Sequence, residues 1–366
     1  TTTTRVYLKN LPASANTIEP THVAFTKIID YSAENYYATN YYNPGLYAPY
    51  GDSIKVEMIE TQTSIKNIKS IKYNTGISAS VPFYTYCVDT SNNCSAKPNA
   101  NPPQGFYFNS LTSDIVFSIF KYRYQGSQFA IRGHHYRKSS NGSWRYVGYT
   151  TLAQNMATNP TRDVLPTING TIFPTFSLPA TVDLCEGDSQ TISIKTQVTK
   201  ALNKYTASLD GNFPKASVST DYSSGNSTPT FRIKMVAKPG DYSSVPGIVT
   251  LRVHADSNWV SGEAARSVPV YVHKPIIPII SVAANGCNNL KGVLKSVNTD
   301  VPVKVTWTIH EKSPSAPAIY TSTSKELLYA GLLPLKYYIK FFVMPFASSC
   351  KCTGKTAIDS LDMKKL

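Results

Sequence analysis

The strongest constraint on the fold is a short-range alternation of apolar and polar residues, interrupted every few residues by turn-forming clusters. Alternation with a period of two is typical of strands buried on one face, whereas a helix needs a period of 3.6. We find no long, capped segment with the helical period. The 25 tyrosines point the same way, because aromatic side chains favour pleated, half-buried surfaces. The sequence therefore predicts an all-β protein.

Predicted strands fall into three groups along the 366 residues, a length that fits two to four modules of about 100–150 residues. The first group comprises 53–60, 80–88, 115–124, 128–137 and 144–150. Its last two strands are joined through Asn141-Gly142, the strongest short signal for a hairpin. The second group comprises 190–198, 231–237, 248–255 and 267–273. The third comprises 303–310, 318–321 and 337–343, and residues 359–366 are expected to form a frayed tail.

Two breaks in the strand pattern, near residue 170 and at the proline-rich connector 274–280, set the predicted boundaries. We expect a Tyr-rich N-terminal β domain over 1–171 and two immunoglobulin-like β-sandwich domains over 172–273 and 274–366. Four strong strands in about 100 residues suit an immunoglobulin-like sandwich. The connector should lead into an edge strand, because proline cannot donate a hydrogen bond to a central ladder.

The six cysteines are an even number without the paired CxxC spacing of zinc sites. They are Cys87, Cys94, Cys185, Cys287, Cys350 and Cys352. Such a set fits disulfides in an oxidising compartment, and the alternative is reduced structural thiols in a cytosolic protein. We predict a disulfide between Cys87 and Cys94, because the residues between them are turn formers that can close a hairpin.

The last third of the chain carries an ordered set of features: Cys287, Trp307, the Gly- and Tyr-containing segment 330–338, and Cys350. This order resembles the Ig-like and PKD-like repeats of surface adhesins that gliding bacteria export by type IX secretion. The segment 184–189, which reads LCEGDS, resembles the strand that opens such repeats. The resemblance covers residues 172–366. It implies secretion to the cell surface, a PKD-like character for the last domain and a disulfide between Cys287 and Cys350.

A candidate binding surface arises where aromatic and basic residues interleave over residues 115–150. Every second residue of a strand shares a face, so neighbouring strands could place arginines beside rings. Arginine suits carboxylate or sulfate, and rings suit sugars or bases. The alternatives are ordinary solvated strand faces or an oligomer contact. The predicted ligand-binding residues are Tyr122, Arg123, Tyr124, Arg132, Tyr136, Arg137, Trp144 and Arg145.

Seven tyrosines crowd into residues 31–50, at positions 31, 36, 37, 41, 42, 47 and 50. Tyrosine combines a large contact area with a polar tip, which favours interfaces and stacking on sugars. A loop folded over its own domain would use the same residues. The sequence does not decide between these two interpretations.

Motifs of common enzymes are absent: the sequence contains no HExxH, GxSxG, Walker A or GxGxxG pattern. His134 and His135 are adjacent, so in a strand they would point to opposite faces and could not share a metal ion. The apolar stretch 326–346 contains two lysines and two prolines, which disfavours a membrane-spanning helix. We therefore predict no catalytic residues, no metal site, no cofactor and no membrane span.

These observations favour an extracellular or cell-surface adhesin or structural protein that binds a ligand through its N-terminal domain. The net charge of +14 would attract an acidic polymer, so the expected partner is an anionic polysaccharide or another cell-surface component. Other copies or subunits of a surface assembly are further expected partners. One alternative is a subunit of an extracellular filament, capsid or tail. Another, from the enzyme class, is a secreted glycan-active enzyme with its site in the first 170 residues.

Overall fold

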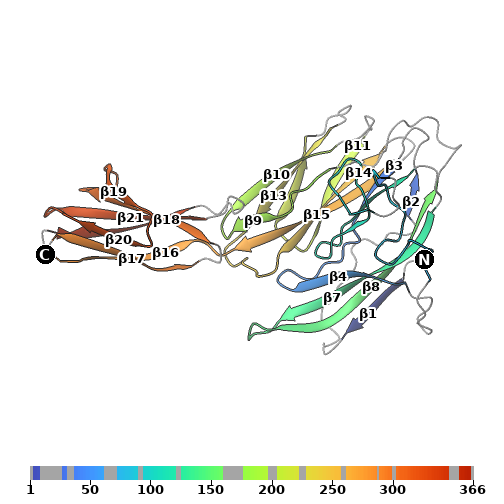
Figure 1. Cartoon of the computed structure of the whole chain (residues 1–366), viewed down its shortest axis with the longest axis horizontal. Coiled ribbons are helices and arrows are strands. Elements are labelled where there is room, and N and C mark those ends of the chain that lie inside the picture. Colours follow the sequence, from blue (N-terminus) through green and yellow to red (C-terminus); the bar gives the residue numbers. More distant parts are fainter. Residues whose placement is uncertain are drawn as a thin grey trace. The chain divides into compact units, whose positions relative to one another are not determined.

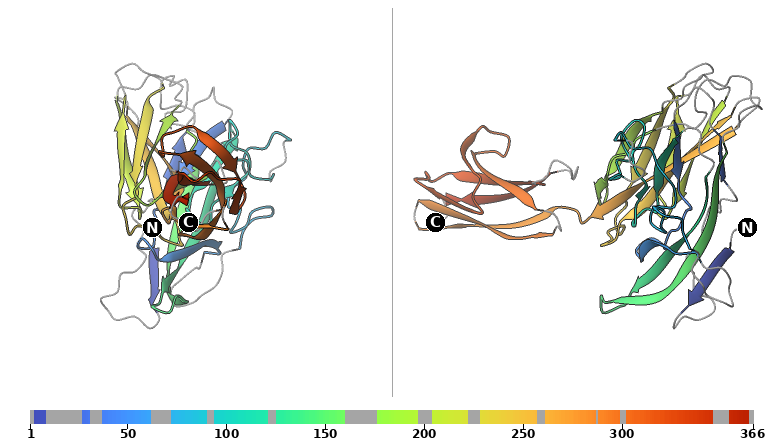
Figure 2. Two further views of the ribbon diagram at one scale, coloured as in Figure 1. Left: turned by 90° about the vertical axis from the view of Figure 1, so that its left-hand side faces the viewer. Right: turned by 45° about the vertical axis from the view of Figure 1, so that its right-hand side comes forward.

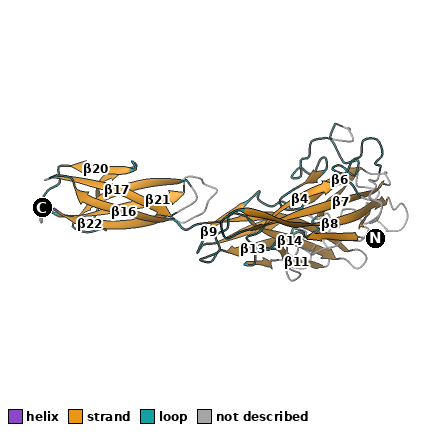
Figure 3. Ribbon diagram, turned by 90° about the horizontal axis from the view of Figure 1, so that it is seen from below, coloured by secondary structure: helices purple, strands orange, loops and turns teal. Residues whose placement is uncertain are grey.

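In a computed structural model of the chain, every regular element of the described residues is a strand, 22 in all (Figure 1). The described residues are 3–8, 27–30, 37–61, 72–89, 94–120, 125–159, 176–196, 204–221, 228–256, 261–286, 288–298, 302–345 and 354–363. The predicted all-β class is thus confirmed, and Figure 3 shows strands throughout. No helix of these residues could span a membrane.

The chain divides into two compact units. The first consists of Thr1–Thr181, Thr191–Met235 and Val245–Val270, and the second of Val182–Gln190, Val236–Ser244 and Tyr271–Leu366. The boundaries predicted from the sequence, after residues 171 and 273, stay predictions.

The N-terminal part contains two sheets around one apolar core. The larger sheet has the order β1-β8-β7-β4, with β2 also paired to β8, and the smaller has the order β3-β6-β5. The strands of the larger sheet are β1 (Thr3–Leu8), β2 (Lys27–Asp30), β4 (Ser53–Ile59), β7 (Gln125–Lys138) and β8 (Trp144–Asn159). Those of the smaller are β3 (Tyr37–Tyr42), β5 (Tyr107–Phe108) and β6 (Ile115–Phe120). Side chains such as Phe117, Phe129 and Ile131 are fully buried in the shared core.

Strands β7 and β8 form the predicted hairpin, which is long and curved (Figure 2). Gly142 adopts a positive φ of 85°, and its N–H donates to the Ser139 carbonyl at 2.9 Å. Asn141 supports the turn by accepting from Ser139 Oγ at 2.5 Å. The Asn-Gly signal therefore placed this hairpin correctly.

The predicted strand over 80–88 is wrong. These residues form no ladder, although Phe83 is buried and stacks on Phe117 with ring centres 5.4 Å apart. Pro82 has no N–H to donate, which is a physical reason why apolar alternation here yields an extended loop instead of a strand. The loop carries Cys87, and the predicted disulfide between Cys87 and Cys94 is confirmed.

The second group of strands forms a seven-stranded sandwich. Its strands are β9 (Val182–Cys185), β10 (Ser189–Lys195), β11 (Lys204–Gly211), β12 (Ala216–Thr220), β13 (Thr230–Val236), β14 (Gly247–Asp256) and β15 (Ser261–His273). One sheet has the order β10-β13-β12 and the other β11-β14-β15-β9. If strands β9 to β15 are lettered A to G in chain order, one sheet has the order B-E-D and the other C-F-G, with A paired to G. This division of strands is that of an immunoglobulin-like sandwich.

A second seven-stranded sandwich follows. Its strands are β16 (Ile277–Ala284), β17 (Asn289–Asn298), β18 (Val303–Glu311), β19 (Ala318–Ser322), β20 (Glu326–Ala330), β21 (Lys336–Pro345) and β22 (Lys355–Asp362). The sheets are β16-β17-β20 and β19-β18-β21-β22. Trp307, on β18, is fully buried at the centre of the core. The strands predicted at 303–310, 318–321 and 337–343 are confirmed.

The expected frayed tail at 359–366 is wrong over its described part. Strand β22 pairs with β21 from Lys355 to Asp362, and Met363 is buried, with its N–H donating to Leu335 O at 3.0 Å. Lys355 is exposed, while the ladder and the buried Met363 hold the backbone. Local composition therefore gave the wrong answer here, because pairing with the preceding strand β21 decides the structure.

The remaining cysteines divide between the described and the undescribed residues. Cys185 is buried and disulfide-bonded, and its partner lies outside the described residues. Cys287, Cys350 and Cys352 lie outside them too. The disulfide between Cys287 and Cys350 therefore stays a prediction.

Within the first compact unit, the tyrosine-rich segment packs on strands β14 and β15 of the first sandwich. Tyr41, Tyr42 and Tyr47 are buried, and the Tyr50 ring meets Phe213 edge-on with centres 5.8 Å apart. Burial raises the pKa of the Tyr47 phenol well above its usual range. Tyr42 belongs to the apolar core of the N-terminal sheets, whereas Tyr41, Tyr47 and Tyr50 contact the first sandwich. These described tyrosines are therefore not an exposed sugar-stacking surface.

A buried polar network runs through this same interface. Asn43 Nδ2 lies 2.7 Å from Asp114 Oδ1 and 2.9 Å from Ser267 Oγ. The Ser267 N–H donates to Asp114 Oδ2 at 2.9 Å, and Arg266 Nε lies 3.6 Å from the same oxygen. Arg252 donates to the Asn43 carbonyl at 3.2 Å. The N-terminal sheets and the first sandwich are therefore joined through specific, buried polar contacts.

Candidate functional site

The outward face of the β7–β8 hairpin gathers seven aromatic and basic side chains, which we term the ring face. They are Arg132, His134, Tyr136 and Lys138 from β7, and Trp144, Tyr146 and Tyr149 from β8. Ring contacts link Arg132, Tyr149, His134, Tyr146 and Tyr136 in turn, and Lys138 lies over the Trp144 ring. The ring centres of Tyr136 and Tyr146 lie 5.4 Å apart, and those of His134 and Tyr149 lie 6.0 Å apart.

Alternation along β7 explains how the ring face forms. Phe129, Ile131 and His135 point inward and are buried, so the residues between them point outward. On β8 the ladder skips one residue: Tyr136 is opposite Tyr146, whereas His135 is opposite Gly148. This β-bulge lets Tyr146 and Tyr149, three residues apart, share one face.

Arg132 is held in place while part of its hydrogen-bonding capacity stays open. Its Nε donates to Thr151 Oγ1 at 3.2 Å, and its guanidinium lies 4.6 Å from the centre of the Tyr149 ring. No residue in the described part of the chain accepts from its two terminal amino groups. The Tyr136 hydroxyl and the Trp144 indole N–H likewise have no partner there, and Trp144 is 41% exposed. The face therefore offers several unused hydrogen-bonding groups beside flat rings.

The ring face also carries negative charge. His134 Nε2 lies 2.8 Å from Glu57 Oε1, and the Glu57 side chain, from the edge strand β4, is 44% exposed. Lys55, on the same strand, is exposed opposite His134. The face is thus a mixed-charge aromatic surface and not a uniformly basic one.

Arg137 and Arg145 do not belong to the ring face. Arg137 donates to Asp52 Oδ2 from Nε at 3.0 Å and from its terminal nitrogen at 2.9 Å, and His135 meets the same oxygen at 2.8 Å. Arg145 is directly opposite Arg137 in the ladder, so it shares that side of the sheet. The assumption that all these arginines line one surface is therefore corrected.

Of the other predicted binding residues, the structure brings together Arg132, Tyr136 and Trp144. Tyr122, Arg123 and Tyr124 lie outside the described residues. Alternation alone could have added His134 and Lys138 to the predicted set. Tyr149 could not be found this way, because its place depends on the bulge. A binding role for all these residues stays a prediction.

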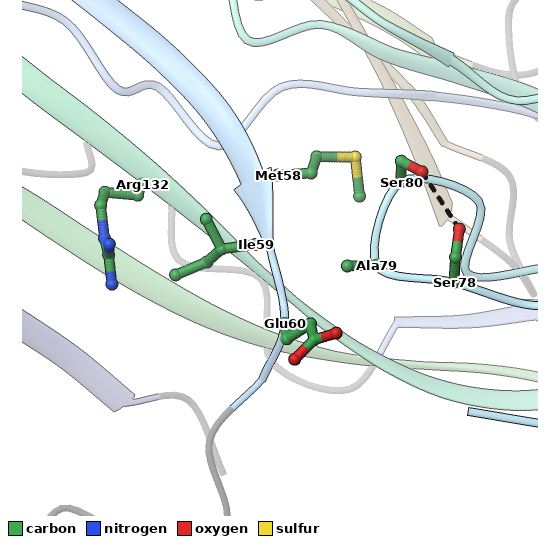
Figure 4. A pocket seen from close by; sticks show the side chains of 7 residues that line it. All are labelled: Met58, Ile59, Glu60, Ser78, Ala79, Ser80 and Arg132. Carbon is green, nitrogen blue, oxygen red and sulfur yellow. Dashed lines mark hydrogen bonds between the residues drawn. The ribbon is translucent and has the colours of Figure 1, made fainter. Parts of the chain in front are cut away.

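A hollow of about 530 Å³ opens at one end of the ring face, beside Arg132 (Figure 4). Its lining comes from the end of β4, from the loop at 78–80 and from β7. Besides Arg132, the lining residues are Met58, Ile59, Glu60, Ser78, Ala79 and Ser80. Ser78 and Ser80 contact each other through their hydroxyls at 3.1 Å. Among the described residues, no group of three or more His, Cys, Asp and Glu side chains could hold a metal ion.

Comparison with known proteins gives no family for the chain. No family model matches it, and no curated protein does. Solved structures similar to it include domains A168–A170 of titin, with 10% identity and a TM-score of 0.34, covering 99% of this chain and 98% of that one. Another is the ICAM-5 D1–D4 ectodomain fragment, with 10% identity and a TM-score of 0.31, covering 98% of this chain and 75% of that one.

The full ectodomain of mouse nectin-like molecule 4 is a third similar structure. It has 10% identity and a TM-score of 0.24, with 93% of this chain and 97% of that one covered. Identities and TM-scores this low indicate neither a common family nor a common function. The immunoglobulin-like assignment instead follows from the strand order of each sandwich.

Proposed function

We propose that the chain is an extracellular surface or structural protein that binds a polysaccharide through the ring face. One observation carries this proposal: half-exposed rings and unused hydrogen-bond donors alternate along a single solvent-facing surface. From Arg132 to Lys138 the face extends over seven residues of strand, or about 20 Å. That length suits several consecutive units of a polymer better than one small molecule.

The cysteines support an extracellular location. Cys87 and Cys94 are bonded to each other, and Cys185 is also in a disulfide. Structural disulfides persist in oxidising compartments and are rare in the cytosol. The resemblance of residues 172–366 to adhesin repeats adds a finer proposal, namely export by type IX secretion in a gliding bacterium.

The ligand chemistry follows from what the face presents. Tyrosine and tryptophan rings pack on the apolar faces of sugar rings, while their polar tips and Arg132 donate hydrogen bonds to hydroxyl or acid groups. The net charge of +14 favours acidic polymers over neutral ones at long range. An acidic polysaccharide is therefore the proposed partner.

The test removes two rings from the face and measures binding to acidic and neutral glycans. In a Tyr136→Ala, Trp144→Ala variant we expect affinity to fall roughly fivefold to hundredfold, since each ring contact contributes about 0.5–1.5 kcal/mol. A matched control is Tyr242→Ala with Tyr338→Ala, since both rings lie under lysines outside the ring face. Equal retention of both variants on every glycan would contradict the proposal, as would binding restricted to single-stranded nucleic acid.

A second candidate function, a subunit of an extracellular assembly, is favoured by apolar side chains exposed on β21 and β22. Phe342, Met344 and Ile358 are 37%, 44% and 54% exposed. Phe342 is opposite Thr356 and Ile358 is opposite Lys340, so Phe342 and Ile358 are diagonal neighbours on one face. Contiguous exposed apolar side chains often mark contact surfaces.

Light scattering after size separation tests this second candidate. If copies associate through these strands, the mass should increase with concentration, and Phe342→Lys should return the chain to a monomer. A monomeric wild type over the whole concentration range would count against assembly through this surface.

A further inference from the structure

We propose that the hollow beside Arg132 is a subsite for one sugar unit that carries a carboxylate, of the uronic acid class. This inference rests on the proposed function, because the subsite would hold one unit of a polymer lying along the ring face. It adds a chemical class of ligand and names Arg132 as the residue that determines specificity.

Arg132 is arranged to receive a carboxylate. The stacking on Tyr149 and the hydrogen bond to Thr151 fix the plane of its guanidinium. Its two terminal amino groups have no acceptor in the described part of the chain. A carboxylate accepts two parallel hydrogen bonds from such a planar donor pair, which adds both strength and geometric selectivity. Little side-chain entropy is lost on binding, because the protein already restrains the group.

The rest of the lining complements a sugar ring. Ile59 offers apolar surface to the C–H face of the ring on the same side of β4 as Arg132. Met58 points to the other side of this edge strand, toward Ser78 and Ser80, whose hydroxyls are able to donate or accept hydrogen bonds (Figure 4). The volume of about 530 Å³ lies within the roughly 300–1,000 Å³ of small-molecule sites. The combination of one cation, two hydroxyls and apolar side chains corresponds to the groups of a sugar acid.

The carboxylates near the hollow favour a sugar acid over a more highly charged polymer. Glu60 lines the hollow, and Glu57 lies on the adjoining ring face. Both would repel the multiple sulfates of a sulfated glycan or the phosphates of a nucleic acid. One carboxylate per unit pairs with Arg132, while Glu60 remains able to accept hydrogen bonds from sugar hydroxyls.

Arg132 also connects the two surfaces. It lines the hollow and at the same time touches Tyr149 of the ring face. A polymer stacked on Tyr136 and Trp144 can therefore continue into the hollow without leaving the sheet. This continuity is what places an acidic unit at Arg132 in our proposal.

The experiment measures equilibrium binding of the full chain to an unsulfated polyuronate oligosaccharide and to its neutral methyl ester. Arg132→Gln should weaken binding of the acid roughly tenfold to hundredfold and binding of the ester clearly less, because the ester loses hydrogen bonds to uncharged acceptors while the acid loses charge-paired ones. Arg132→Lys should recover only part of the loss, because an ammonium cannot donate in the forked geometry. Arg232→Gln is the charge-matched control, since Arg232 is exposed, pairs with Asp221 and lies on β13, outside the ring face.

Three outcomes would overturn the subsite. The first is an equal loss for acid and ester in Arg132→Gln, and the second is the same loss in the Arg232→Gln control. The third is tighter binding of wild type to a sulfated oligosaccharide or to oligothymidylate than to the polyuronate. If acid and ester bind wild type equally while the Tyr136→Ala, Trp144→Ala variant loses both, the proposed function stands and the subsite fails. If no glycan binds at all, both fail together.

Discussion

Replacing Asp114 with alanine is expected to destabilise the first compact unit by about 3–5 kcal/mol, the usual cost of leaving one partner of a buried ion pair alone. Asp114 is 2% exposed and accepts hydrogen bonds from Asn43 and from the Ser267 N–H. It is also the acidic neighbour of Arg266, which is itself buried. The alanine variant would leave the buried Arg266 charge without its acidic neighbour and the Ser267 N–H without an acceptor.

Denaturant titration followed by hydrogen exchange on β6, β14 and β15 measures this loss. Asp221→Asn is the matched control, because Asp221 is 41% exposed, pairs with Arg232 at 3.6 Å and should contribute at most about 1 kcal/mol. Equal stability of the Asp114→Ala variant and wild type would show that the buried network does not join the N-terminal sheets to the first sandwich.

The same residue gives the chain a defined response to pH. Burial raises the pKa of Asp114, and this effect outweighs the lowering by Arg266 and by the hydrogen bonds from Asn43 and Ser267. The folded chain therefore binds this proton more tightly than the unfolded chain, whose value is about 3.9. At pH values between the pKa of Asp114 in the unfolded chain and its higher pKa in the folded chain, the contribution of Asp114 to the free energy of unfolding increases as pH falls. Because Asp114→Asn lacks this titration, the stability difference between wild type and Asp114→Asn should widen on acidification.

Much of the fold could be predicted from local pattern, because strand alternation and turn chemistry are local properties. Asn141-Gly142 placed the hairpin, and alternation placed the strands around Trp307 and Phe341. The network around Asp114 could not be predicted in this way. Asn43 and Asp114 look like ordinary turn residues in the sequence. The Ser267 N–H, which donates a hydrogen bond to Asp114, is 153 residues away along the chain.

The candidate site shows where alternation stops being sufficient. It correctly indicates that Arg132 and Tyr136 share a face, because they are four residues apart on one strand. It does not show that the bulge on β8 shifts the phase and brings Tyr149 beside Arg132. It also does not show that Asp52, in the turn before β4, holds Arg137 on the other side of the sheet. Both facts depend on the register between strands, which sequence alternation does not encode.

Replacing Trp307 with alanine is expected to cost about 3–5 kcal/mol, within the range for large aromatic residues in cores. The side chain is fully buried, its ring centre lies 4.3 Å from that of Phe341, and its Nε1 donates to the Ser324 carbonyl at 3.0 Å. A β-carbon placed on Gly292 would lie only 3.1 Å from the Trp307 ring, so the surrounding strands already pack closely on it. The cavity left by alanine would therefore be large, and the strands could close it only by breaking their own pairing.

Hydrogen exchange of the intact chain can show where this loss occurs. We expect Trp307→Ala to lower protection across β17, β18 and β21 and to leave β7 and β8 unchanged, because Trp307 belongs to the core of the second compact unit. Trp144→Ala is the matched control: the same atoms are removed from a side chain that is 41% exposed, and surface changes usually stay within about 0.5 kcal/mol. Protection lost equally in β7 and β18 would mean that the two compact units unfold together, which the separate core around Trp307 argues against.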